Sequence, residues 1–218
     1  MKRTLVCTQD GSYTFKVDAL GECYHSLHGA IQEAKEVYLQ AGLEYFVLHH
    51  PQTKRIRIFE MGFGTGLNAW LTFQYAQERQ IAIEYWAIEK YPLNGNEVAL
   101  LNYSHDNSFY LLHDAPWEEP YVPSNHFTLV KQQADLLQYS PPDHIDVVYF
   151  DAFAPNTQPY LWQSEVFATL YRHMSPNAVL VTYSAKGSVK EALRSAGFSL
   201  QRIKGAGNKR HMLRATKE

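Results

Sequence analysis

Three glycines alternate with other residues at one point of the 218-residue chain, after a short apolar run and before a run with helical spacing. The stretch, residues 58–68, reads IFEMGFGTGLN. Glycine lets the backbone turn sharply and lets a ligand approach without meeting a Cβ atom. A strand that enters such a turn and continues into a helix is typical of nucleotide-binding α/β proteins, so this segment constrains the fold of the whole chain.

Apolar strands alternate with helical patterns from residue 55 onward. Strands are expected at 56–60, 81–89, 127–134, 146–150, 178–183, 199–203 and 211–215, and helices at 67–79, 94–102, 161–173 and 189–196. This alternation predicts an α/β fold with a mostly parallel sheet and helices on both faces. The stretch 104–125 has poor periodicity and contains three prolines, which indicates a loop.

The first 52 residues have a different pattern. A Gln-Asp-Gly-Ser turn joins two segments of alternating apolar residues, which predicts a β-hairpin. Helical spacing follows, with Gly42 as the expected helix stop. We therefore expect residues 1–52 to form a hairpin-and-helix extension packed on the core, and residues 53–218 to form the main domain.

Composition excludes several classes of protein. No stretch approaches the ~20 apolar residues that a membrane-spanning helix requires, and the apolar run near the amino terminus is too short for a signal peptide. Cys7 and Cys23 have no paired-ligand spacing and the ten histidines are scattered. We expect a cytoplasmic protein with no membrane contact and no metal.

Charge is distributed unevenly along the chain. Residues 186–217 contain nine basic residues and one acidic residue, although the whole chain has a formal net charge of −2. Clustered Lys and Arg side chains neutralise phosphates, so one face could bind a polyanion. A solvated charged surface explains the same composition, and charge alone leaves both interpretations open.

Two ligand classes compete for the glycine turn. A dinucleotide site expects a small residue at the sixth position of G-x-G-x-x-G/A, where this chain has Leu67, and the turn lacks the Lys-Ser/Thr pair of a phosphate-binding loop. Glu60 would repel a pyrophosphate but would suit a cationic aminoacyl group. The turn therefore favours S-adenosylmethionine. Glu89, which ends the second strand, could bind ribose hydroxyls of either cofactor.

The order acid-x-Gly-x-Gly-x-Gly resembles the first motif of the class I methyltransferases. That resemblance implies a Rossmann-like, mostly parallel seven-stranded sheet with a carboxy-terminal β-hairpin. It also implies that Asp135, at the end of the third strand, bonds the adenine amino group.

A second stretch, residues 147–162, reads VVYFDAFAPNTQPYLW and contains a candidate catalytic group. Asp151 ends a buried strand and should face the same crevice as Glu60 and Glu89, because ligands of open parallel sheets bind beyond the carboxyl ends of the strands. Phe153 and Trp162 offer flat apolar surfaces nearby. The alternative is a turn in which Asp151 bonds its own backbone and the aromatic rings lie in the core.

Several motifs in order resemble the MnmC-type methyltransferase domain, over nearly the whole chain. They are DGSYTF, YHSLHGAIQEAKEVYL, FEMGFGTGLN, FDAFAPNTQPYLW, TYSAKGSVKEALRSAGF and KGAGNKRHML. The family methylates the amine of 5-aminomethyl-(2-thio)uridine at the tRNA wobble position. Relatives commonly have Asp-Gly-Phe-Ala-Pro where this chain has Asp-Ala-Phe-Ala-Pro, and bifunctional members add a flavin-dependent oxidase domain whose glycine fingerprint this sequence lacks.

The resemblance matches Asp151 to the acidic residue of the catalytic loop. We expect Asp151 to act as a weak base, or as an acceptor that orients the amine while water takes the proton, and Phe153 and Trp162 to stack on the uracil, because the wobble base must leave its stack to be reached. Tyr24, His25 and Glu33 could close the crevice. The expected cofactor residues are Glu60, Gly62, Gly64, Gly66, Asn68, Glu89 and Asp135, and the expected tRNA contacts are Lys204, Lys209 and Arg210.

The aminomethyl group of the substrate would be made by a separate enzyme. The sequence leaves open whether this protein works alone or docks to that enzyme. Three alternatives stay open: the same fold acting on another amine, a nucleotide-dependent oxidoreductase, and a non-catalytic RNA-binding module. Leu67 and Glu60 disfavour the oxidoreductase, and the three cofactor-type acids disfavour the binding module.

Overall fold

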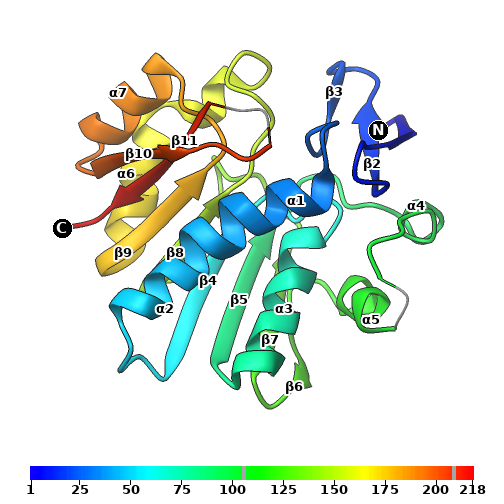
Figure 1. Ribbon diagram of the computed structural model, residues 1–218, viewed down its shortest axis with the longest axis horizontal. Coiled ribbons are helices and arrows are strands. Elements are labelled where there is room, and N and C mark those ends of the chain that lie inside the picture. Colours follow the sequence, from blue (N-terminus) through cyan, green and yellow to red (C-terminus); the bar gives the residue numbers. More distant parts are fainter. Residues whose placement is uncertain (105–106, 208–209) are drawn as a thin grey trace.

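The computed structural model describes residues 1–104, 107–207 and 210–218 (Figure 1). Its strands are β1 (Arg3–Cys7), β2 (Tyr13–Val17), β3 (Glu22–Cys23), β4 (Arg55–Met61), β5 (Ala82–Ile88), β6 (Pro120–Ser124), β7 (Phe127–Gln132), β8 (Ile145–Phe150), β9 (Met174–Thr182), β10 (Ser199–Lys204) and β11 (His211–Thr216). Its helices are α1 (Ala30–Ala34), η1 (Lys35–Glu44), α2 (Tyr45–His49), α3 (Leu67–Arg79), α4 (Gly95–Val98), α5 (Ser108–Asp114), η2 (Pro159–Trp162), α6 (Ser164–His173) and α7 (Gly187–Ser195).

The central sheet has the strand order β10-β11-β9-β8-β4-β5-β7-β6. The five strands from β9 to β7 are parallel, and the hairpin β10–β11 adds antiparallel to β9. These seven strands confirm the predicted sheet. From β4 the chain adds β5 and β7 on one side, and later adds β8 and β9 on the other side. β4 and β8 therefore meet at the point where the strand order switches, and ligands of such sheets bind at this point.

An eighth strand corrects the prediction for residues 104–125, where a loop was expected. This stretch contains α5 and the edge strand β6, which pairs antiparallel with β7. Pro120 and Pro123 are compatible with an edge strand, because an edge strand does not need every backbone N–H for the ladder. Their presence made the strand hard to recognise from sequence.

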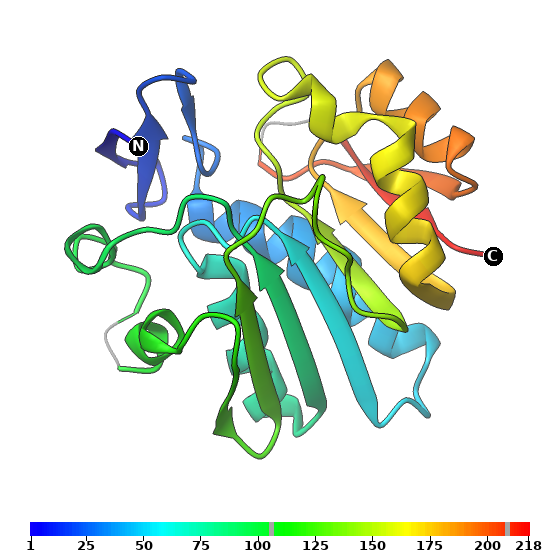
Figure 2. The same ribbon diagram turned by 180° about the vertical axis from the view of Figure 1, so that it is seen from behind.

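Helices cover both faces of the sheet, as Figures 1 and 2 show. One face packs against the continuous helix α1–η1–α2 and against α3, in a cluster that includes Tyr38, Tyr85 and Tyr149. The other face packs against α6 and α7, in a cluster that includes Phe150 and Phe167. No helix among the described residues is long and apolar enough to cross a membrane.

Gly42 does not end the amino-terminal helix, contrary to expectation. The helix continues to His49, and residues 35–44 have π-helical hydrogen bonding. A Cβ atom at Gly42 would lie 2.9 Å from a methyl group of Val181 and 3.2 Å from the Tyr149 ring. The glycine therefore serves close packing of the helix on the sheet, which a sequence pattern does not distinguish from a helix stop.

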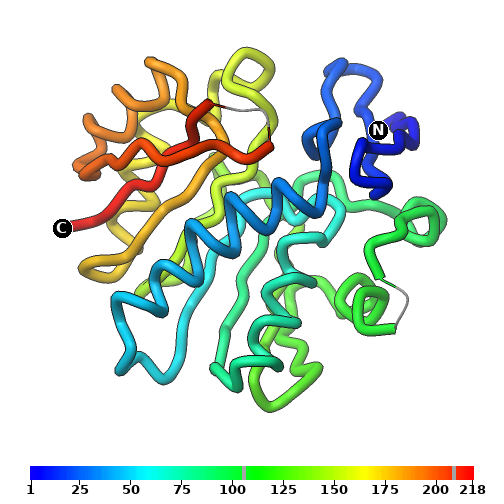
Figure 3. The backbone as a smooth tube through the Cα atoms, in the orientation of Figure 1, coloured from blue at the N-terminus to red at the C-terminus, as the bar shows by residue number. Residues whose placement is uncertain are grey.

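The predicted amino-terminal hairpin is present as β1 and β2, and β3 extends it to a three-stranded sheet. This small sheet stands beside the central sheet, at the end where β4 and β5 finish, and the two chain ends lie on opposite sides of the molecule (Figure 3). We propose that residues 1–52 fold together with residues 53–218, because the helical part of the extension packs against the central sheet.

Candidate functional site

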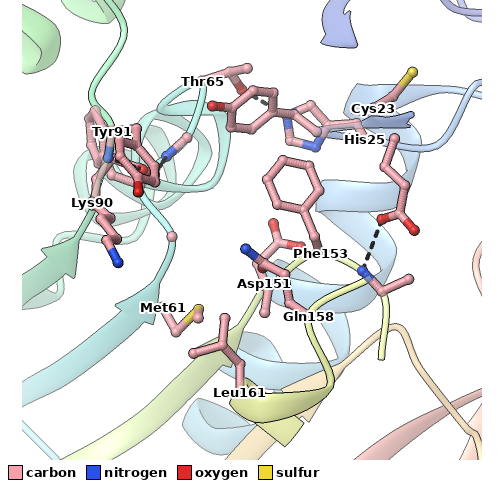
Figure 4. Close-up of a pocket in the computed structure, with 18 of the residues that line it drawn as sticks. Cys23, His25, Met61, Thr65, Lys90, Tyr91, Asp151, Phe153, Gln158 and Leu161 are labelled. Carbon is pink, nitrogen blue, oxygen red and sulfur yellow. Dashed lines mark hydrogen bonds between the residues drawn. The ribbon is translucent and has the colours of Figure 1, made fainter. Parts of the chain in front are cut away.

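A cavity of about 420 Å³ lies beyond the carboxyl ends of β4, β5 and β8 (Figure 4). The glycine turn and the loop after β8 form its walls, and residues 21–27 of the amino-terminal extension close one side. Its size suits a nucleoside-sized ligand. The extension is therefore part of the site.

The glycine turn has a backbone that requires glycine. Gly62, Gly64 and Gly66 have φ angles of +92°, +51° and +72°, which residues with a Cβ rarely adopt. A Cβ atom at Gly62 would lie 3.1 Å from the Asp151 carbonyl oxygen, and one at Gly64 would lie 3.0 Å from the Tyr24 ring. Gly62 and Gly64 line the cavity, and Gly66 lies between two residues that line it, Thr65 and Leu67.

Glu89 holds the turn in place while lining the cavity. Its Oε2 accepts from the backbone N–H of Gly64 at 3.0 Å, and its Oε1 accepts from the N–H of Tyr91 at 2.8 Å. Each carboxylate oxygen has two acceptor positions, so these bonds are compatible with ribose binding. Its assignment to a ribose stays a prediction.

Asp135 also lines the cavity and forms an ion pair with Lys90, with 2.7 Å between Oδ2 and Nζ. The hydrogen bond from Lys90 lowers the pKa of the Asp135 carboxyl. Asp135 Oδ1 accepts from the N–H of Leu137 at 3.1 Å. Adenine binding at Asp135 stays a prediction, and a ligand amino group there would share the carboxylate with Lys90.

Glu60 does not face the cavity, which corrects the expected direct contact with a cationic group. It is 1% exposed and lies beneath the turn, where Asn68 Nδ2 donates to its Oε1 at 2.9 Å. Burial raises the pKa of the Glu60 carboxyl well above its usual range, because the charged form is desolvated there. Glu60 therefore supports the site through Asn68, which lines the cavity.

Asp151 lies at the carboxyl end of β8 and lines the cavity beside the glycine turn. The Tyr38 hydroxyl donates to its Oδ1 at 2.6 Å, and Asn68 Nδ2 donates to its Oδ2 at 3.0 Å. Its backbone N–H donates to the Met61 carbonyl at 3.2 Å, which joins the two strand ends. The carboxylate is therefore held at both oxygens.

The two aromatic residues of the loop have different environments. Phe153 lines the cavity (Figure 4). Its ring contacts that of Tyr24 edge-to-face, with centroids 5.2 Å apart. Trp162 is 4% exposed and is not among the lining residues, because its indole packs between Phe150 and Tyr183. Its Nε1 donates to the Phe153 carbonyl at 2.9 Å. The expectation that Trp162 stacks on a base is wrong, and Trp162 supports the loop instead.

The amino-terminal extension binds both walls. Glu22 accepts from the backbone N–H of Ala154 at 3.0 Å and from the Thr157 hydroxyl. His25 Nε2 lies 2.7 Å from the Thr65 hydroxyl. Tyr24, His25 and Glu33 all line the cavity.

Two residues that sequence reasoning missed are Glu22 and Tyr38. Both bind the loop that begins at Asp151. Tyr38 has core-like helical spacing and Glu22 follows a turn, so no local signal marked either of them.

A buried pair supports the glycine turn from behind. His113 Nε2 lies 2.9 Å from the Thr65 carbonyl oxygen, and Lys131 Nζ donates to the His113 carbonyl at 2.6 Å. Burial lowers the pKa of His113 to about 4 and that of Lys131 to about 8. His113 is therefore neutral at pH 7, and its Nε2–H donates to the turn.

This pKa shift predicts a loss of stability in acid. The unfolded chain binds a proton at His113 near pH 6.5 and the folded chain only near pH 4, so the stabilisation is complete above pH 6.5 and is lost as the pH falls toward 4. Between pH 7 and 4.5 the loss in unfolding free energy is about 2 kcal/mol. Denaturant unfolding of His113→Gln should show a correspondingly weaker pH dependence, whereas His28→Gln, at an exposed position, should match the wild type. Equal pH dependence in His113→Gln and the wild type would contradict this.

The basic residues of the carboxy-terminal region fall into two groups: some bond to other parts of the protein, and others are exposed. Arg214 is 8% exposed, lies over the Tyr45 ring and donates to the Ala41 carbonyl, and Lys217 donates to two backbone carbonyls. Lys204 and Arg210 are exposed, whereas Lys209 lies outside the described residues. The β10–β11 loop reaches the extension, because the Gly207 N–H donates to Glu36 at 3.2 Å.

Within the described residues, no group of three or more His, Cys, Asp or Glu side chains could hold a metal ion.

Comparison with known proteins gives a consistent result. Residues 126–218 match the model of a family of S-adenosyl-L-methionine-dependent methyltransferases. The chain is similar to the tRNA 5-methylaminomethyl-2-thiouridine biosynthesis bifunctional protein MnmC of Pseudomonas savastanoi pv. phaseolicola, 31% identical over 89% of this chain and 32% of that protein. It is 32% identical to the MnmC protein of Burkholderia multivorans, over 96% of this chain and 34% of that protein. The chain thus spans about a third of the length of these relatives.

A solved structure, MNMC2 from Aquifex aeolicus, superposes with a TM-score of 0.84 at 26% identity, covering 98% of this chain and 70% of that one. Spermidine synthase from Thermotoga maritima, at a TM-score of 0.55 and 13% identity, shares the fold alone.

The residues present fit S-adenosylmethionine. Gly62 and Gly64 leave a bare backbone along the cavity wall, Glu89 ends β5 beside it, and carboxylates line the space that a sulfonium ion would enter. The glycine turn, the strand order and the similarity over nearly the whole chain agree. The chain therefore corresponds to the methyltransferase domain of the MnmC-type proteins.

Proposed function

We propose that this protein transfers a methyl group from S-adenosylmethionine to the amine of 5-aminomethyl-(2-thio)uridine at the tRNA wobble position. The observation that carries the proposal is the place of Asp151, held by two donors beside the glycine turn in a cavity lined with acids. The names of the MnmC relatives support the substrate, and a cytoplasmic location follows from it as part of the proposal.

The negative charge of the cavity lining favours the binding of two cationic ligands. Among the described residues, five carboxylates line it, against one lysine and the amino-terminal residue Met1; they are Glu22, Glu33, Glu89, Asp135 and Asp151. A cleft lined by one sign of charge concentrates ligands of the opposite sign. The sulfonium donor and an alkylammonium group both carry positive charge, so the cavity suits the pair.

Asp151 would act on the amine. An alkylamine is mostly protonated near neutral pH, and only its neutral form is a nucleophile. Asp151 either takes one proton from the ammonium group, or accepts a hydrogen bond from the amine while water takes that proton; in both cases it orients the lone pair of the neutral amine. When bound, S-adenosylmethionine supplies the methyl group: the nitrogen lone pair forms the new N–C bond while the S–C electron pair stays on sulfur. The product ammonium then releases its proton to solvent.

Phe153 offers the apolar ring in this arrangement. It lines the cavity beside Asp151, and single-stranded bases that leave their stack commonly bind on aromatic side chains. We propose that it contacts the uracil.

The carboxy-terminal hairpin supports a nucleic-acid substrate. Lys204 and Arg210 are exposed at the end of the β10–β11 hairpin, whose loop contacts the extension through Gly207 and Glu36. Residues 24–27 and Glu33 of that extension line the cavity. A polyanion bound along the hairpin would therefore lie near the cavity mouth, and we propose that it is the tRNA anticodon arm. The enzyme that makes the aminomethyl group is the second partner in this proposal.

Replacing Lys204 and Arg210 by alanine should weaken tRNA binding and make it less sensitive to salt. Each phosphate contact contributes roughly 0.7–0.9 to the slope of log K against log salt concentration, so the double variant should lose about 1–2 from the slope. Filter binding between 50 and 200 mM salt measures this. Lys54→Ala, which removes an exposed cation just before β4, at the opposite end of the parallel strands, is the control. A slope equal to that of the wild type would place the tRNA elsewhere.

The function is tested directly by incubating the purified protein with S-adenosylmethionine and tRNA that bears the aminomethyl group. Mass analysis of the digested nucleosides should show a gain of one methyl group on the wobble uridine, and none on tRNA that lacks the aminomethyl group. Methylation of small free amines in place of tRNA would identify the protein as a methyltransferase for another amine.

A further inference from the structure

A tyrosine outside the cavity reaches the carboxylate inside it. Tyr38 is 2% exposed and does not line the cavity, yet its hydroxyl donates to Asp151 Oδ1 at 2.6 Å. The donor comes from the amino-terminal helix and the acceptor from the end of β8, which are 113 positions apart in sequence. Because Tyr38 is buried behind Asp151, it acts on a ligand only through that side chain.

The local geometry of the helix brings this hydroxyl within reach. Tyr38 lies in the π-helical segment η1, and such segments are frequent at functional sites. One turn later, Gly42 lets the helix contact Val181 and Tyr149 more closely than any larger residue would allow. The Tyr38 ring packs against that of Tyr149, with centroids 5.4 Å apart. The ring is therefore held by packing, and the hydroxyl points to Asp151.

The hydroxyl remains a donor at any physiological pH. Burial, and then the charge of Asp151, raise the pKa of Tyr38 well above its usual value. Asn68 donates to the other carboxylate oxygen. Other titratable groups near this pair are Glu33 and Tyr183, which interact with Tyr38, Glu60 and Tyr85, which interact with Asp151, and Tyr149, whose ring packs on Tyr38; burial raises the pKa of Glu60.

We propose that Tyr38 is a positioning residue for methyl transfer: its hydrogen bond, together with that of Asn68, fixes the orientation in which the Asp151 carboxylate meets the substrate amine. This inference rests on the proposed function. Small displacements of a reacting group reduce rates strongly, and a carboxylate that lost one of its two donors would sample other rotamers.

Tyr38→Phe removes the hydroxyl alone and keeps the ring against Tyr149. With tRNA bearing the aminomethyl group, kcat should fall between roughly 10- and 100-fold. The KM for tRNA and the affinity for S-adenosylhomocysteine, measured by calorimetry, should stay within about threefold, because Tyr38 touches neither ligand. Tyr149→Phe is the matched control, since it removes an equally buried hydroxyl that does not contact Asp151, and its kcat should stay within about twofold.

A double-mutant cycle shows whether Tyr38 acts through Asp151. On an Asp151→Asn background, Tyr38→Phe should change kcat less than twofold, since the carboxylate that it orients is gone. The same fold-loss on both backgrounds, or a Tyr38→Phe kcat within twofold of the wild type, would overturn the proposal.

An NMR titration of ¹³C-labelled aspartate carboxyls needs no turnover. Loss of the donor should raise the titration midpoint of Asp151 in Tyr38→Phe above that of the wild type, because the hydrogen bond favours the charged carboxylate. An unchanged midpoint overturns the role of Tyr38, whereas a wild type that shows the hydrogen bond but does not methylate the tRNA overturns the proposed function instead.

Discussion

Replacing Asp151 by asparagine is expected to lower kcat for methylation of aminomethyl-bearing tRNA about 1,000-fold, which corresponds to about 4 kcal/mol of activation free energy. The change keeps the shape of the side chain and removes its charge. An amide cannot take a proton from the ammonium group, and it would present an N–H to either Tyr38 or the substrate. A single-turnover assay with labelled S-adenosylmethionine measures the effect on the chemical step.

Two measurements separate this effect from a general loss of structure. The affinity of Asp151→Asn for S-adenosylhomocysteine should remain within about threefold of the wild type, because the glycine turn and Glu89 are unchanged. Asp143→Asn, at a side chain that is 75% exposed just before the same strand, should keep its full kcat. If Asp151→Asn retained more than about a tenth of the wild-type kcat, Asp151 would not be the acceptor, and the proposed mechanism would have to use another group.

Replacing Gly62 by alanine should weaken S-adenosylhomocysteine binding at least 100-fold, or about 3 kcal/mol. Two effects add. The φ angle of +92° disfavours any residue with a Cβ, and the new methyl group would lie 3.1 Å from the backbone oxygen of Asp151. Either the turn or the loop after β8 must move, and both line the cavity. Isothermal calorimetry measures the affinity.

The same substitution should lower the melting temperature by about 2–12 °C, because backbone strain at such a position costs roughly 1–3 kcal/mol and each kcal/mol corresponds to about 2–4 °C for a chain of this size. Gly95→Ala is the control: Gly95 begins α4, has no strained φ angle, and has open space where a Cβ would point. It should change neither the affinity nor the melting temperature measurably. Wild-type affinity in Gly62→Ala would show that the cofactor does not contact this turn.

Much of the site could be predicted because its residues follow strand ends. Glu89, Asp135 and Asp151 each follow a short apolar run, and the carboxyl ends of parallel strands meet at one edge of a sheet. The structure brings all three to one cavity. Glu60 was misplaced because sequence shows that a residue precedes the turn but not to which face of β4 it points. Its burial, which raises the pKa of the carboxyl, depends on packing.

Trp162 and Tyr38 have roles that a local sequence pattern does not reveal. A tryptophan beside a candidate catalytic loop has the same sequence context whether it faces a ligand or the core, and packing against Phe150 and Tyr183 decided the matter here. Tyr38 has the spacing of a core residue and also holds the carboxylate. Contacts between residues more than a hundred positions apart leave no local pattern.

The sequence by itself determined the α/β class, seven of the eight strands of the sheet, the glycine turn and the acids at the ends of its strands, because these depend on local periodicity and on backbone angles that only glycine adopts readily. Only the tertiary structure decided which of those acids are buried, which aromatic ring faces the cavity and which distant side chains orient Asp151. Those properties depend on desolvation and on contacts between segments far apart in the chain, and both arise only when the helix and the amino-terminal sheet pack against the strands.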